Sequence, residues 1–274
     1  MFNLLSADLY TVKKSKAVFV MILLGAAISI AFVFMLKFVV MNLPASEIGQ
    51  GSNKVVMGWS LSKFDAYKFN ALYLANQVFG NGDIIPLLIA IFVCMFVTGE
   101  FAHGTIRNIL TIGCKKSTFY LSKLIIVCAA SVDIMLSTVI TTFIAGGFVF
   151  GFGTDTRING IIDFLGILAV QAFLHMAFAS LFLMIALLVK NVGGSIAISM
   201  CTVLFLSIAF AITSSTAFKS GQIISSWWLS TNIAALTAPS LTTGTIVKAV
   251  FVGFLFIAIT TTLGMSIFTR QDVK

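Results

Sequence analysis

Long apolar runs separated by short polar stretches dominate the chain. A helix needs roughly 17–25 mainly apolar residues to cross a bilayer, and its backbone must satisfy its own hydrogen bonds there. The runs that reach this length are residues 17–41, 84–100, 119–150, 161–189, 194–216 and 246–268. The alternating ten-residue segments of a membrane β-barrel are absent. The pattern predicts an all-α integral membrane protein with six transmembrane helices, in which residues 1–274 form a single transmembrane domain.

The stretches outside the runs carry helical patterns of their own. Residues 1–16 place apolar side chains at helical spacing, which predicts an interfacial helix on the membrane surface; a frayed leader to the first run is the alternative. Residues 217–245 are too polar to span and too apolar for a free loop, so re-entrant helices are expected before the last run. Residues 42–83 are expected to hold an outer amphipathic helix. Its apolar face comprises Phe64, Tyr67, Ala71, Leu74 and Val78.

Composition supports the membrane assignment and excludes other classes. Hydrophobic residues make up 59% of the chain and charged residues 9%, far from the mix of a soluble domain. The net charge is +8, and the basic residues that produce it lie at the ends of apolar runs and form no continuous stripe. This distribution argues against nucleic-acid binding. The positive-inside rule places both termini and the loop 101–118 in the cytoplasm. The four cysteines include no CxxC pair, so neither a disulfide framework nor a zinc site is predicted.

Enzyme motifs are absent from the sequence. The nearest approach to a P-loop is GCKKST at 113–118, where Cys114 stands in place of the lysine and Asn108 in place of the first glycine. No HExxH and no GxSxG motif occurs. The chain is therefore predicted to have no catalytic residue, no metal site and no bound cofactor.

Two ionisable residues fall inside predicted spans. Asp133 lies in the third run and His175 in the fourth. Such groups are costly in lipid and often mark a transport path, so both are candidate functional residues. The alternative is structural: Ser131 or Ser137 with water would satisfy Asp133, and a backbone carbonyl would bind a neutral His175.

The stretch GEFAHGTIRNILTIGCKKSTFY at 99–120 concentrates charge between two apolar runs. One explanation is that these charges only set topology. The order of residues also indicates a role in contacting a partner protein. A helix end, a glycine break and a short, partly apolar helix suit an element that receives force from such a partner. The residues of this candidate site are Glu100, Gly104, Thr105, Arg107, Leu110, Lys115 and Lys116.

With Glu100 followed by Gly104–Thr105, this loop resembles the cytoplasmic loop of permease subunits of type-2 ABC exporters. The resemblance covers the whole chain at the level of plan, although GCKK at 113–116 stands where a proline and an arginine are common. It implies that a coupling helix between the second and third spans docks onto a separate cytosolic ABC ATPase. ATP and Mg would bind that ATPase. A second permease copy, identical or homologous, is the other implied partner, with membrane lipid around both.

The family resemblance also implies a bacterial plasma-membrane location and a function. Short six-span members often export peptides or confer immunity to antimicrobial peptides. We therefore expect an exporter of amphipathic or antimicrobial peptides, with hydrophobic drugs or lipids as further candidates. A self-sufficient secondary transporter or channel is the alternative. Such a protein is expected to have paired intramembrane carboxylates or matching broken spans in its two halves, and neither is evident in this sequence. A membrane scaffold without transport is a third possibility.

Overall fold

The computed structural model confirms an all-α membrane protein. It describes residues 2–42, 55–56, 59–60, 70–79, 83–102, 104–111, 115–152, 161–215, 223–238 and 241–270. Six helices within these ranges are long and apolar enough to cross a membrane. They are α2 (Lys16–Asn42), α4 (Ile84–Ala102), α6 (Lys116–Phe150), α7 (Ile161–Val189), α8 (Val192–Ser215) and α11 (Thr243–Arg270). Each coincides with a predicted span to within a few residues.

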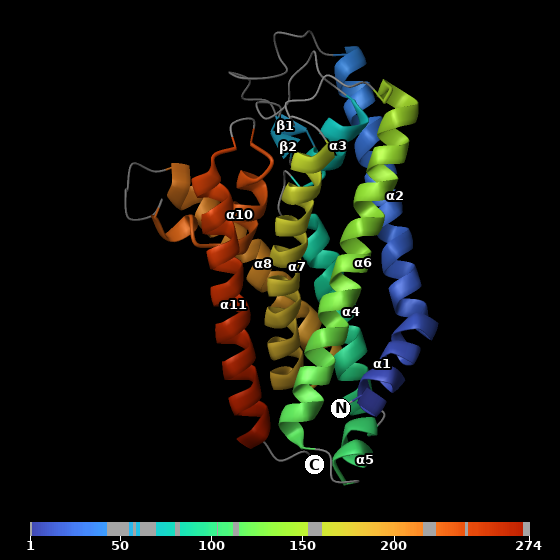
Figure 1. Ribbon diagram of the computed structural model, residues 1–274, viewed down its shortest axis with the longest axis vertical. Coiled ribbons are helices and arrows are strands. Elements are labelled where there is room, and N and C mark those ends of the chain that lie inside the picture. The colour runs from blue at the N-terminus through green and yellow to red at the C-terminus, as the bar shows by residue number, and fades with distance from the viewer. Residues whose placement is uncertain are drawn as a thin grey trace.

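Short elements occupy the two ends of this bundle (Figure 1). At one end lie α1 (Phe2–Lys14) and α5 (Thr105–Thr111); at the other lie α3 (Ala71–Gln77) and α10 (Leu229–Ala235). The strands β1 (Val55–Val56) and β2 (Trp59–Ser60) form one small antiparallel pair. Only Ala71, Leu74 and Val78 of the expected outer amphipathic face lie within the described residues; Phe64 and Tyr67 lie outside them.

Helix α7 forms the centre of the bundle, packed against α4, α6 and α11. Its side chains Leu174, Phe178 and Phe182 are fully buried. The rings of Phe178 and Phe182 stack, and Trp228 meets Phe178 edge-on beside α10. This aromatic core joins α7 to the short helix that enters the bundle from the far end.

Helices α2 and α6 approach closely because small residues meet at their contact. Ser29 Oγ donates hydrogen bonds to the carbonyl oxygens of Gly25, at 2.8 Å, and of Thr138 across the interface, at 3.1 Å. A Cβ added to Gly25 would lie 2.7 Å from the Thr138 methyl carbon, so only glycine fits here without a shift. Gly25 and Ser29 thus serve the packing of α2 on α6.

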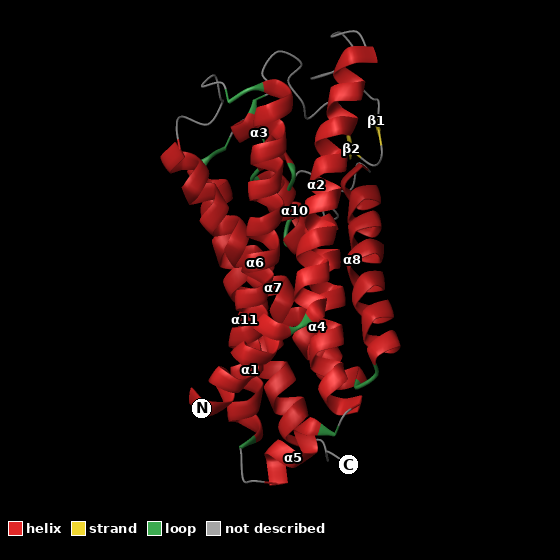
Figure 2. Cartoon of the chain, turned by 90° about the vertical axis from the view of Figure 1, so that its right-hand side faces the viewer, coloured by secondary structure: helices red, strands yellow, loops and turns green. Residues whose placement is uncertain are grey.

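Both views place α1, α5 and the last turn of α11 at the same end of the molecule (Figures 1 and 2). Six crossings bring the chain back to the side on which it began. The predicted coupling helix α5 therefore shares its face with both ends of the chain, and this face holds the candidate site.

Candidate functional site

The corner between α4 and α5 is formed by a glycine in a left-handed conformation. Gly104 has φ of 67°, and its N–H donates to the carbonyl of Phe101 at 3.1 Å. A side chain is strained in this region, whereas glycine adopts it readily. The chain therefore stops α4 at Ala102 and starts α5 at Thr105 in a new direction.

A buried ion cluster lies beside this corner and joins three helices. The Lys123 ammonium on α6 lies 2.7 Å from Asp8 Oδ1 of α1 and 2.5 Å from Glu100 Oε1 of α4. The Ser122 hydroxyl also donates to Asp8, at 3.1 Å. The Lys123 side chain is fully buried. These contacts fix the first helix and the end of α4 to a common point on α6.

The surroundings of Lys123 strengthen this cluster. Its ammonium lies 4.9 Å from the ring centroid of Phe96 and 5.3 Å from that of Phe119. Aromatic faces attract a cation, most strongly away from water. Two carboxylates share this one ammonium, and Glu100 Oε2 is buried without a hydrogen-bond partner among the described residues. The cluster therefore retains a spare hydrogen-bond acceptor at Glu100.

A cavity of about 240 Å³ adjoins Glu100. It lies between the junction of α1 and α2 and the α4–α5 corner. The residues lining it are Thr11, Ser15, Ala17, Met95, Phe96, Gly99, Glu100 and Thr105. Glu100 thus borders the space between the first helices and the coupling corner.

Sequence reasoning singled out Glu100 but missed its two partners. These partners are Lys123, seven residues into α6, and Asp8 on α1. A usable signal existed, since a lysine seven residues beyond the start of α6 needs an anionic partner when it is buried. Which acids supply it depends on tertiary packing.

The remaining loop residues are spread over two places. Thr105, Arg107 and Leu110 lie on α5, and the side chains of the last two lie outside the described set. Lys115 is the residue that precedes α6. Lys116 Nζ donates to the Thr269 carbonyl at 3.1 Å, which ties the start of α6 to the end of α11. Among the candidate residues whose side chains the structure describes, Glu100 is the one that belongs to the ion cluster.

The two intramembrane candidates lie in different environments. Asp133 is exposed on the surface of α6, and the hydroxyls of Ser131 and Ser137 donate to helix carbonyls instead. His175 is fully buried on α7, and its Nδ1 lies 2.7 Å from the Gln171 carbonyl oxygen. The structure does not bring them together.

The fold and this corner define a multi-pass membrane protein of the transport-permease class, with a short helix presented between its second and third spans. Residues 4–205 match the family description "ABC-2 family transporter protein". The chain belongs to the ABC-2 family of transporter membrane proteins. No curated protein matches the chain at a significant level.

Proposed function

We propose that this chain is the permease subunit of an ATP-driven exporter and that α5 receives a separate cytosolic ATPase. The observation that carries the proposal is the Asp8–Lys123–Glu100 cluster next to the α4–α5 corner. It ties α1, α4 and α6 together, so a displacement at α5 would be passed to all three. ATP and Mg would bind the partner, because this chain has no P-loop.

Coupling of this kind needs two conformations with different affinity for the ATPase dimer in its closed form. ATP binding would then shift the equilibrium between them by that difference. Interfaces held by discrete contacts suit such a switch, since packed helices move as rigid bodies. Two permease copies would each present one α5 to one ATPase, and the transported molecule would pass between them.

The proposed cargo is an amphipathic peptide, with hydrophobic drugs or lipids as the next candidates. The chain contains 27 phenylalanines and few charges, and its long helices expose Phe19, Phe34 and Phe38 on α2. A peptide that partitions into the membrane would reach such a surface from the bilayer. The family membership supports transport but leaves the cargo open.

The first test is affinity purification of the tagged, detergent-solubilised chain from its native cells, with identification of the proteins that accompany it. We expect a P-loop ATPase in stoichiometric amount. Recovery of the chain alone, under conditions that preserve known complexes of this type, would contradict the proposal and favour a transporter that works by itself.

Coupling is then tested in the purified complex with Glu100→Gln and Arg107→Ala. Both should reduce stimulated ATP hydrolysis by about fivefold or more, the lower bound of typical coupling energies. Lys13→Ala, which removes an exposed charge of α1 outside the cluster, is the matched control and should leave it unchanged. Equal activity in all three variants would show that the corner does not transmit force.

A further inference from the structure

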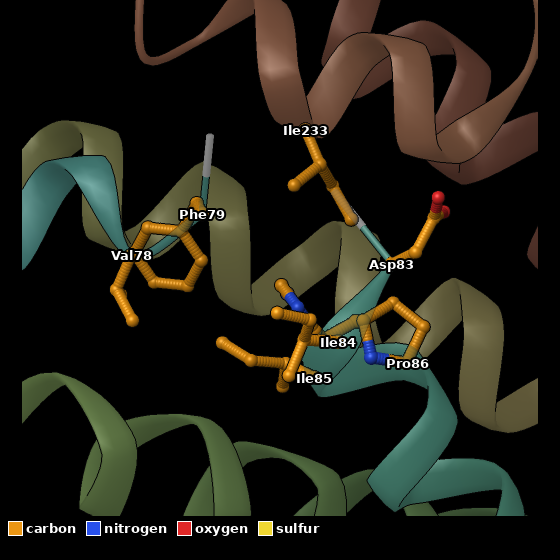
Figure 3. Close-up of a pocket in the computed structure, with 8 residues that line it drawn as sticks. Val78, Phe79, Asp83, Ile84, Ile85, Pro86 and Ile233 are labelled. Atoms are coloured by element: carbon orange, nitrogen blue, oxygen red, sulfur yellow. The ribbon is translucent and has the colours of Figure 1, made fainter. Parts of the chain in front are cut away.

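A narrow crevice lies at the opposite end of the molecule from α5, between α3, the first turn of α4, α7 and α10. Figure 3 shows Val78 and Phe79 at the end of α3 and Ile84, Ile85 and Pro86 at the start of α4, with Ile233 reaching in from α10. His175 of α7 also lines it. In this conformation the crevice is too narrow to admit a water molecule.

Two side-chain amides near this crevice hold α10 and the turn that follows it, and His175 is bound within α7. Gln171 Nε2 donates to the Ile233 carbonyl at 3.0 Å, and Gln77 Nε2 donates to the Thr237 carbonyl at 3.2 Å. His175 Nδ1 lies 2.7 Å from the Gln171 carbonyl oxygen. A carbonyl only accepts hydrogen bonds, so the amide NH₂ groups and the Nδ1–H of the imidazole must face these oxygens.

Three buried acceptors remain near the crevice, beside the Ser230 hydroxyl of α10, which can donate as well as accept. His175 Nε2 in the crevice is buried and has no hydrogen-bond partner among the described residues. The same holds for Gln171 Oε1, one turn earlier on α7, and for Asn76 Oδ1 on α3, two residues before Val78; neither residue lines the crevice itself. Gln171 and His175 are fully buried one helical turn apart on α7. The Asp83 carboxylate stands at the rim and accepts from the Ser207 hydroxyl at 2.8 Å. Each of the three acceptor atoms calls for a donor, and the Asp83 carboxylate lines the same crevice as His175.

The hydrogen-bonding groups of the possible ligands indicate which kind of donor fits these acceptors. A hydroxyl or a water molecule brings lone pairs of its own, whereas an ammonium or guanidinium group brings three to five N–H donors and no acceptor. A neighbouring carboxylate favours such a cation further. Buried acceptors without partners are costly, so a conformation in which α10 moves away from α7 and a cationic group enters would satisfy them.

We propose that this crevice is the closed form of a binding site for the ammonium or guanidinium groups of the transported molecule, with Gln171 and His175 as its specificity-determining residues. The inference rests on the proposed export function and narrows its cargo to cationic molecules. Opening toward α10 would expose the site on the side of the membrane opposite α5.

The probe is a pair of amphipathic leucine–lysine peptides that differ only in acetylation of every lysine. Acetylation removes the charge while keeping most of the apolar surface. We expect the complex in proteoliposomes to transport the charged peptide about tenfold better than the acetylated one, the value of one good hydrogen bond to a cation. Gln171→Met and His175→Leu should each abolish that preference.

Gln77→Met is the matched control, because Gln77 also holds α10 by its amide but leaves no buried polar atom without a partner. It should keep the preference for the charged peptide. The inference is overturned if the wild-type complex transports both peptides equally or neither, or if Gln77→Met and Gln171→Met behave alike. Recovery of the ATPase partner with each variant separates this outcome from failure of the proposed function.

Discussion

The ammonium of Lys123 is the residue-scale feature that organises the α5 end of the molecule. A buried cation is tolerated only when anions and aromatic faces surround it, and Asp8, Glu100, Phe96 and Phe119 do so here. Removing Lys123 would cost about 3–5 kcal/mol, because both carboxylates would then stay buried without their cation. Glu100 therefore has a structural role beside its proposed role in coupling.

Asp83 provides a pH-dependent prediction at the same scale. Burial raises the pKa of its carboxyl above the ordinary 3.8, and the hydrogen bond from Ser207 offsets part of that rise. The folded state then holds the proton to higher pH than the unfolded chain. Stability is therefore unaffected below the ordinary pKa and falls as the pH rises through the interval up to the raised one.

Asp83→Asn removes the buried charge with little change of shape. We expect the variant to unfold at a higher temperature than wild type at pH 7, with the difference shrinking as the pH falls toward 4. Thermal unfolding of the detergent-solubilised protein across this range measures it. A gap between the two proteins that does not vary with pH would contradict the assigned cause.

At the scale of elements, the contact between α2 and α6 depends on the absence of a side chain at Gly25. Thr138 cannot turn away freely, since its hydroxyl donates to the carbonyls of Ile134 and Met135. Gly25→Ala should therefore destabilise the protein by about 1–3 kcal/mol, the usual cost of overpacking. Chemical unfolding in detergent, read by tryptophan fluorescence, measures the change.

Gly166→Ala on α7 is the control for this substitution. No atom lies within 4 Å of the Cβ it would gain, and alanine favours a helix over glycine. It should be neutral or slightly stabilising. A loss at Gly166 equal to the loss at Gly25 would mean that general helix propensity, not the contact with Thr138, controls the outcome.

The membrane-spanning helices could be predicted from the sequence, whereas the Asp8–Lys123–Glu100 ion cluster could not. An apolar run such as 84–100 has one stable form in lipid, so its helix follows from composition and length alone. The meeting of Asp8 with Lys123 joins residues far apart in the chain, and only the packing of α1 on α6 produces it. The crevice near His175 likewise depends on where α10 enters the bundle, which no periodicity encodes.

For the whole molecule, the ends of the chain and α5 lie on one side, and the proposed cationic site lies toward the other (Figure 1). Basic residues near α5 should hold that side in the cytoplasm. We expect a protease-cleavable tag after Lys274 to be protected in intact cells and cleaved after permeabilisation. A tag inserted near residue 52 should show the reverse. Cleavage of the C-terminal tag in intact cells would refute the orientation.

The ion cluster also sets an order for biogenesis. Asp8 leaves the ribosome first, Glu100 follows much later, and Lys123 emerges last. Until α6 enters the membrane, the two acids lack the cation that pairs with both, so the ion cluster cannot hold α1 against the other helices. A nascent chain arrested between α4 and α6 thus holds both acids without the cation that pairs with them in the completed protein.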